Sequence, residues 1–193
     1  LFSLRSGKII VAVGLLPNRR ERRIKGMYEV GEYIVYGCKG VCRIEDITQL
    51  DIPGSNRDRL YYVLAPFGDE KGKIYAPTDN KKVMMRRVIT REEAEQLIKD
   101  MPNIEELWVS DERMREVKYK EALKTCDYRA WISIIKTLYF RKKERIAQGK
   151  KITSLDERYL KATENELYSE LSLILEIPKE KMEDYICKQL EAV

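Results

Sequence analysis

The side chains of this 193-residue chain limit its possible chemistry, because the sequence contains no histidine. Serine–histidine, cysteine–histidine and histidine–metal catalysis are therefore excluded. The cysteines are Cys38, Cys42, Cys126 and Cys187. They form no CxxC pair, so we interpret them as free thiols and expect neither a metal site nor a cofactor. Carboxylate or lysine catalysis stays open, although no acidic pair marks a site for it.

Positive charge is concentrated in one stretch of the second half of the chain. Residues 113–151 hold 13 Lys or Arg and 4 Asp or Glu, a local charge of +9, whereas residues 152–193 carry −5. Such a surface can contact DNA phosphates, or it can be an ordinary solvated helix face, where the helix dipole favours basic residues near the C-terminus. The candidates for phosphate contact are Arg113, Arg115, Lys118, Arg141, Lys142, Lys143, Arg145, Lys150 and Lys151.

Trp108 is a further candidate for a contact with nucleic acid. It stands just before an expected helix and has acidic residues on both sides. A Trp at a helix entry is most often a packing anchor. If its ring is exposed beside the basic helices, it can instead insert at a base step of the minor groove. Trp131 differs, because it lies on an apolar helix stripe that includes Tyr139 and is expected in the core.

The elements that must position these residues change character at Thr90. Between Met27 and about Ile89, short β-like runs alternate with turns, which favours a small barrel over an open sheet. The runs are EYIVYG, GVCRIEDITQL, LYYVLAPF, IYAP and VMMRRVI. The predicted fold class is therefore α+β, with a small β-barrel in residues 27–89 followed by an all-α domain in residues 90–193.

Five helices are predicted after the barrel from their end signals. Thr90 and Glu93 have the spacing of a capping box, with Ile89 as a staple. A second helix has Asp111 and Glu112 in its first turn and runs to about Thr125. The other signals are Asp127 as cap and Gly149 as end of the third helix, Ser154 and Glu157 as capping box of the fourth, and Pro178 at the start of the fifth.

Residues 1–26 differ from the rest of the chain in charge. They hold seven Lys or Arg and one Glu, whereas residues 27–193 carry a net charge of −1. The run RRERRIKGM is what a purine-rich ribosome-binding stretch before a start codon would encode. We therefore expect Met27 to begin the barrel and residues 1–26 to be a non-native or disordered leader. The alternative is a genuine disordered basic arm that binds nucleic acid.

Several runs of the sequence resemble one family of bacterial transcription regulators. YEVGEYIVYGCKGVCRIEDI, YYVLAP and IYAPTDN resemble the N-terminal module of CarD-like regulators, which also occurs in transcription-repair coupling factors. The stretch from YKEALKTCDYRAW to LYSELSLIL resembles the helical part of the same family, so the match covers residues 27 to about 176. The resemblance implies a Tudor-like, or SH3-like, barrel that binds the β subunit of RNA polymerase. It also implies helices that contact promoter DNA at the upstream edge of the transcription bubble.

Two features depart from the family pattern. Aligning LKTCD places the family's wedge Trp, which slows bubble collapse, at Glu112, one helical turn after Trp108. We favour Trp108 as a shifted equivalent; the alternative is that the wedge is missing. Basic residues that face polymerase in some members fall here at Leu50 and Tyr75. The contact is therefore expected to be more apolar, and the nearby basic residues Arg57, Arg59 and Lys73 are candidates to replace them.

The sequence thus predicts a cytoplasmic, non-enzymatic regulator that docks on polymerase and stabilises the open promoter complex. No membrane contact is expected, because no apolar run approaches the ~20 residues of a membrane span, and no small-molecule substrate is implied. The alternative is a polymerase-binding interaction module whose basic helices recruit an acidic protein instead of DNA. Activation or repression, the target promoters and the oligomeric state stay open.

Overall fold

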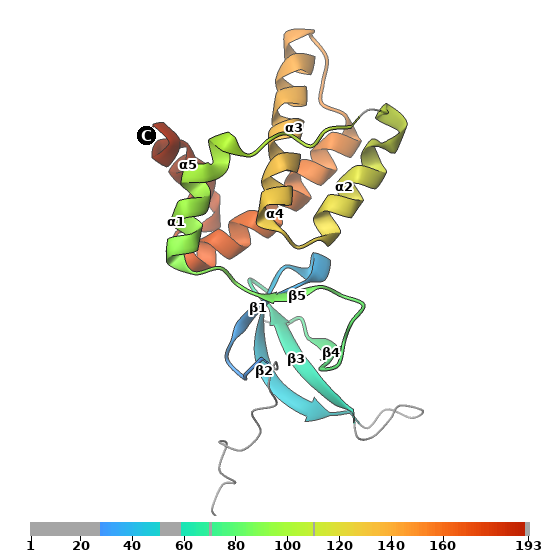
Figure 1. Ribbon diagram of the computed structural model, residues 1–193, viewed down its shortest axis with the longest axis vertical. Helices are drawn as coiled ribbons and strands as arrows, with labels where there is room; N and C mark the ends of the chain where they lie inside the picture. The colour runs from blue at the N-terminus through green and yellow to red at the C-terminus, as the bar shows by residue number, and fades with distance from the viewer. Residues whose placement is uncertain (1–27, 51–58, 70, 110, 192–193) are drawn as a thin grey trace, which may run out of the picture.

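The computed structural model describes residues 28–50, 59–69, 71–109 and 111–191, in which a sheet is followed by helices (Figure 1). The strands are β1 (Tyr33–Tyr36), β2 (Val41–Gln49), β3 (Leu60–Pro66), β4 (Ile74–Pro77) and β5 (Met85–Arg87). The α-helices are α1 (Arg91–Asp100), α2 (Arg115–Lys124), α3 (Tyr128–Ala147), α4 (Ser154–Leu175) and α5 (Met182–Glu191). The predicted α+β class is confirmed. Residues 1–26, Met27 and Arg57 lie outside the described residues.

Within the described residues the strands form one antiparallel sheet in the order β4-β3-β2-β1-β5. The strands β4 and β5 stand at its two edges and do not pair with each other. The closed barrel expected from the sequence is therefore not confirmed. The edge strands have only four and three residues, and after Arg87 the chain leaves the sheet for the helices. β4 and β5 are therefore too short to close the sheet into a barrel by pairing with each other.

The strand β1 is buried on both faces, which explains why its sequence reads as a continuous apolar run. Ile34 packs on one side with Cys42, Ile44, Tyr62 and Leu64 inside the curved sheet. Its neighbour Val35 faces the opposite way, because side chains alternate along a strand. On that side Val35, Val41 and Ile89 share a core cluster with residues of α1, α3, α4 and α5. The sheet and the helices are therefore joined by a common apolar core.

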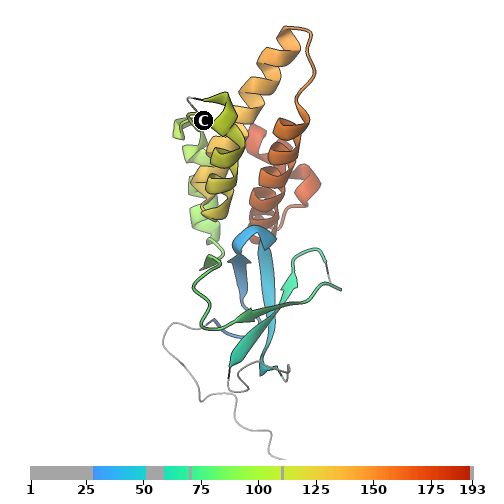
Figure 2. The ribbon, with the colours of Figure 1, turned by 90° about the vertical axis from the view of Figure 1, so that its right-hand side faces the viewer.

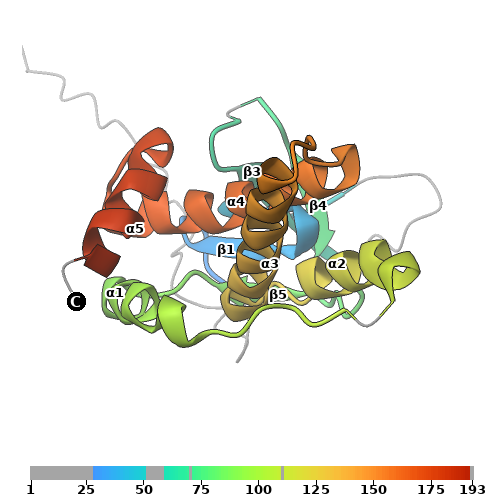
Figure 3. The ribbon, with the colours of Figure 1, turned by 90° about the horizontal axis from the view of Figure 1, so that it is seen from above.

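The helices stand on one end of the sheet (Figure 2). Seen from above, α1 and α5 lie on one side, α2 on the other, and α3 and α4 between them (Figure 3). α3 and α4 make extensive contact with each other. Residues of α2, α3 and α4 form a second cluster, which includes Tyr119, Ile134 and Leu160.

The predicted helix ends are largely confirmed. Glu93 N–H donates to Thr90 Oγ1 over 3.2 Å and Thr90 N–H donates to Glu93 Oε2 over 2.8 Å, which completes the capping box of α1. Asp127 caps α3, accepting from Arg129 N–H. Before α2, Asp111 caps a short 3₁₀ turn, η3 (Glu112–Met114).

One predicted cap is wrong by one residue. The fourth helix was expected to start with a capping box of Ser154 and Glu157, but Thr153 caps α4 instead. Thr153 is extended and its side chain accepts from Asp156 N–H, whereas Ser154 is already helical. Two adjacent hydroxyl residues give equal local signals, and the path of the preceding loop decides between them.

The four thiols differ in exposure, which predicts their reactivity. Cys38 and Cys187 are exposed, whereas Cys42 and Cys126 are buried, and burial raises the pKa of both buried thiols to about 11. The thiolate is the reacting form, so near pH 8 a thiol reagent should label Cys38 and Cys187 and spare the other two. Peptide mapping by mass spectrometry would check this. Rapid labelling of all four before unfolding would contradict it.

The described residues form neither a metal-binding cluster nor a membrane-spanning helix. No group of three or more histidine, cysteine or acidic side chains is arranged to hold a metal ion in them. No helix in the same part of the chain combines the length and apolarity needed to cross a membrane.

Candidate functional site

Trp108 lies in an extended segment that runs along α3. Leu107 N–H donates to Thr137 Oγ1 over 2.8 Å, and Ser133 Oγ donates to Glu105 O over 2.7 Å. These bonds fix the backbone just before Trp108, yet its side chain is 80% exposed. Trp108 is therefore not a packing anchor. Trp131, by contrast, is 1% exposed and lies in the core as predicted.

The other end of this segment is fixed by ion pairs. Arg141 Nη1 donates to Glu112 Oε1 over 2.8 Å, and Arg141 Nη2 donates to Glu112 Oε2 over 3.0 Å. Arg115 Nη1 lies 2.9 Å from Glu112 Oε2. These contacts, led by the hydrogen bonds from Arg141, lower the pKa of Glu112. Buried Asp156, at the start of α4, lies 3.6 Å from Arg115 and 3.9 Å from Arg141. Both arginines are thus partly neutralised where they stand.

The remaining basic candidates are more accessible, but they do not all gather on one face. Lys118 pairs with Glu121, Lys143 lies over the Tyr139 ring, Arg145 donates to Lys151 O, and Lys150 donates to Gln148. The side chains of Arg113, Lys142 and Lys151 are exposed and make no hydrogen bond or ion pair within the described part of the chain. Arg141 faces η3, the turn before α2, whereas Arg145 turns toward the loop after α3.

The structure also exposes apolar side chains that sequence reasoning did not single out. Phe140 and Ile146 on α3 and Met114 and Val117 near α2 are exposed large hydrophobic residues. Tyr139, expected on the buried stripe of the third helix, is likewise exposed. Lys143 covers its ring from the next turn. In the sequence, the only sign of this exposed apolar surface is that Tyr139 and Phe140 directly precede the basic run.

On the sheet, the predicted polymerase contacts lie near β3, β4 and their flanking loops. Leu50 is half-buried at the end of β2, and Arg57 lies outside the described residues. Arg59 Nε donates to Asp79 Oδ1 over 3.0 Å, and Lys73 Nζ lies 3.4 Å from Glu45 Oε2. Tyr75 on β4 is 50% exposed. Arg59 directly precedes β3 and contacts Asp79 beyond the end of β4, so it lies at the same edge of the sheet as Lys73 and Tyr75.

The strand β4 is an accessible edge of the sheet. It pairs with β3 only, as far as the described residues show. Thr78 N–H donates to Leu60 O over 3.0 Å, so this N–H points toward β3. Successive N–H groups along β4 point alternately toward β3 and away from it. The N–H of Tyr75 therefore points away from β3 toward the open edge. Pro77 has no N–H, so Tyr75 is the main donor that this edge can offer a partner.

An open cavity of about 500 Å³ lies between the loop after β4 and the end of α2. Its lining combines lysines with aromatic, apolar and neutral polar residues: Tyr28, Tyr62, Thr78, Asn80, Lys81, Lys82, Val83, Met84, Met85 and Lys124. This lining contains no carboxylate or cysteine. The cavity therefore offers no carboxylate for acid–base catalysis.

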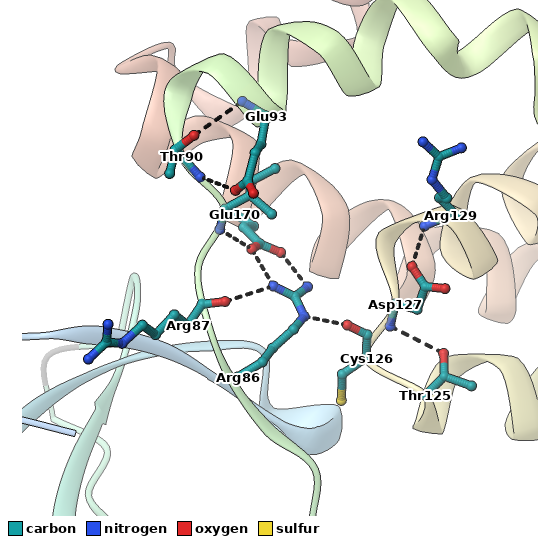
Figure 4. Close-up of polar contacts among 10 residues, drawn as sticks. Arg86, Arg87, Thr90, Glu93, Thr125, Cys126, Asp127, Arg129 and Glu170 are labelled. Carbon is teal, nitrogen blue, oxygen red and sulfur yellow. Dashed lines mark hydrogen bonds and ion pairs between the residues drawn. The ribbon is translucent and has the colours of Figure 1, made fainter. Parts of the chain in front are cut away.

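Arg86 and Glu170 form a buried contact between sheet and helices that sequence reasoning missed (Figure 4). Arg86 Nη1 lies 2.6 Å from Glu170 Oε1, and Nη2 lies 2.8 Å from Oε2. Glu170 is 1% exposed on the inner face of α4. The signals were an arginine within the apolar run VMMRRVI and a glutamate within LYSELSLIL. Neither identifies its partner.

Comparison with known families bears on the sheet. Residues 28–89, which span β1 to β5, match the family model of the CarD-like/TRCF RID domain. This family is a non-catalytic RNA polymerase-interacting domain. No curated protein sequence matches the chain. The sheet-bearing part of this chain, residues 28–89, is therefore a member of the CarD-like RNA polymerase-interacting domain family.

Proposed function

We propose that this protein is a bacterial transcription regulator that docks on the β subunit of RNA polymerase and stabilises the open promoter complex. The match of residues 28–89 to a polymerase-interacting family carries the proposal. The docking domain comprises residues 27–89. The helical domain of residues 90–193 contacts promoter DNA at the upstream edge of the bubble.

Docking is proposed at the β4 edge of the sheet. An exposed strand edge can accept a strand of a partner through main-chain hydrogen bonds, while flanking side chains give specificity. The outward N–H and half-exposed ring of Tyr75 provide the centre of such a contact. The other proposed contacts to polymerase are Leu50, Arg57, Arg59 and Lys73.

DNA contact is proposed at Trp108 and at basic residues of α2, α3 and their flanking turns. An exposed flat ring on a fixed backbone suits insertion at an unstacked base step. Arg113, Lys118, Lys142, Lys143, Arg145, Lys150 and Lys151 contribute phosphate contacts, which position a protein without reading sequence. Arg115 and Arg141 contribute mainly by holding Glu112, and with it the segment that carries Trp108.

The lifetime of open complexes formed by the cognate polymerase tests the DNA contact. The protein should lengthen the lifetime, and Trp108→Ala should shorten it about 5- to 30-fold, because a stacked aromatic ring contributes ~1–2 kcal/mol. Trp108→Phe keeps a flat ring and should retain part of the effect. Both variants should bind polymerase as the native protein does. Equal lifetimes for native protein and Trp108→Ala would move the contact away from Trp108.

Polymerase affinity tests the docking edge. Tyr75→Ala should weaken binding about tenfold, since a central aromatic residue of an interface commonly contributes over 1 kcal/mol. Arg87→Ala is the matched control, because Arg87 is exposed on β5 at the opposite edge. Titration of labelled protein with polymerase measures both. If Arg87→Ala weakened polymerase binding and Tyr75→Ala did not, docking would occur at the β5 edge, and the proposed β4 edge would be wrong.

A second candidate function is recruitment of an acidic protein by the helices. The exposed Tyr139, Phe140 and Ile146 among the lysines of α3 favour this alternative, since such mixed surfaces suit protein partners. The affinity of residues 27–193 for duplex DNA, measured over a range of salt concentrations, separates the two. Phosphate contacts predict a steep fall of affinity with salt. An absence of measurable DNA affinity both alone and within the promoter complex would favour recruitment.

A further inference from the structure

Arg86 links β5 to several helical elements at once. Besides its two bonds to Glu170 on α4, its Nε donates to Cys126 O over 2.5 Å, in the turn between α2 and α3. Its guanidinium also lies 5.7 Å from the ring centre of Tyr128 and 5.6 Å from that of Trp131, both on α3. All three guanidinium nitrogens that can donate are therefore used. One side chain of the sheet thus joins α3, α4 and the turn before α3.

The receiving groups are themselves held in place. Glu170 Oε1 also accepts from Ile89 N–H over 3.0 Å, so the carboxylate bridges Arg86 and the chain that leads into α1. Cys126 has φ of +54°, a region that residues with a side chain rarely occupy. In that conformation its carbonyl meets Arg86 Nε. The position of the turn and the position of Arg86 are therefore coupled.

The apolar core alone does not define one orientation of the sheet on the helices. Val35, Val41 and Ile89 pack against helical residues, and this burial holds the two parts together. Apolar burial is non-directional, so small rotations cost little. A forked arginine–carboxylate pair, in contrast, is satisfied in only one geometry. Replacing such a pair by apolar residues often leaves stability unchanged, so we expect this pair to contribute to the specificity of the orientation more than to stability.

We propose that Arg86 is a positioning residue, which with Glu170 fixes the docking sheet and the helices that carry Trp108 in a single orientation. This inference rests on the function proposed above. A protein with two linked binding surfaces gains overall affinity only when both surfaces can bind at the same time. If the linkage is rigid and holds the matching geometry, the effective concentration of the second surface is higher. Once the sheet docks on polymerase, the pair places Trp108 at one position relative to the DNA.

The orientation can be measured directly in the full protein. The double variant Arg86→Met/Glu170→Met removes both charges while keeping the interior filled. Spin labels go on native Cys187 of α5 and on Lys71→Cys, an exposed position of the turn between β3 and β4, with Cys38→Ser; Cys42 and Cys126 are buried. Double electron–electron resonance should give one narrow distance for the native pair. The double variant should give a distribution at least twice as wide.

Controls separate a change of orientation from a general loss of structure. Glu157→Met/Lys161→Met removes an exposed pair of α4, 3.1 Å apart, with the same substitutions and should leave the distance narrow. Arg86→Lys keeps the charge but cannot fork and also bond Cys126 O, so it provides a second test if the double variant does not fold. Distributions as narrow as the native one in the folded variants would overturn the proposal.

A functional measurement shows whether the orientation matters. The double variant should bind polymerase within twofold of the native protein, but its effect on open-complex lifetime should fall at least fivefold. A broadened distance with an undiminished lifetime would overturn the positioning role. If the native protein itself fails to lengthen the lifetime, the proposed function fails, and the distance measurement still decides whether the pair sets the orientation.

Discussion

Glu170→Ala is expected to destabilise the folded protein by about 3 kcal/mol, the lower end of the cost of breaking a buried ion pair, because Glu170 is buried whereas the Arg86 side chain is 23% exposed. The substitution leaves the Arg86 guanidinium without its carboxylate and Ile89 N–H without an acceptor. An uncompensated charge and an unsatisfied donor in the interior both favour the unfolded state. Equilibrium unfolding in urea measures the change in the free energy of unfolding.

The matched control for this prediction lies on the same helix. Glu157 pairs with Lys161 over 3.1 Å in an exposed contact of one turn. Glu157→Ala should cost less than about 0.5 kcal/mol, because exposed pairs contribute little. Equal effects of the two substitutions would show that burial of Glu170 does not set the strength of its pair. The contrast between single and paired substitutions is also informative, since removing both charges of the buried pair should cost much less than removing one.

Trp131→Ala is expected to cost about 3–5 kcal/mol, as large-to-small changes of buried aromatic residues do. Trp131 is 1% exposed, its Nε1 lies 3.4 Å from Leu123 O, and its ring centre lies 5.6 Å from the Arg86 guanidinium. The substitution leaves a cavity and removes one wall of the Arg86 site. Urea unfolding, followed by the remaining Trp108 fluorescence or by circular dichroism, measures the loss.

The second tryptophan provides the comparison for the first. Trp108 is 80% exposed, and Trp108→Ala should change the free energy of unfolding by no more than about 0.5 kcal/mol. The two substitutions are chemically identical, so the difference between them reports environment alone. A large loss of stability with Trp108→Ala would mean that the ring packs in solution, and this would remove the basis for a DNA contact at that position.

The sequence by itself determined the local elements of this protein. Apolar alternation and turn residues identified the strands, and the capping box of Thr90 and Glu93 located the start of α1. The runs in residues 28–89 also identified the polymerase-interacting domain, which the family match confirms. These signals act between residues a few positions apart, so they can be read without knowing the rest of the fold. The error at Ser154 is likewise local and amounts to one residue.

Only the tertiary structure decided which distant residues meet. Arg86 and Glu170 are 84 positions apart, and nothing near either of them indicates the other. The pairing of Arg115 and Arg141 with Glu112 and Asp156 was equally hidden, so a cluster that reads as +9 in sequence is partly neutralised in space. The open sheet and the exposure of Trp108 and Tyr139 depend in the same way on what covers each surface. Packing between segments, unlike helix capping, depends on the path of the whole chain, and no local pattern encodes it.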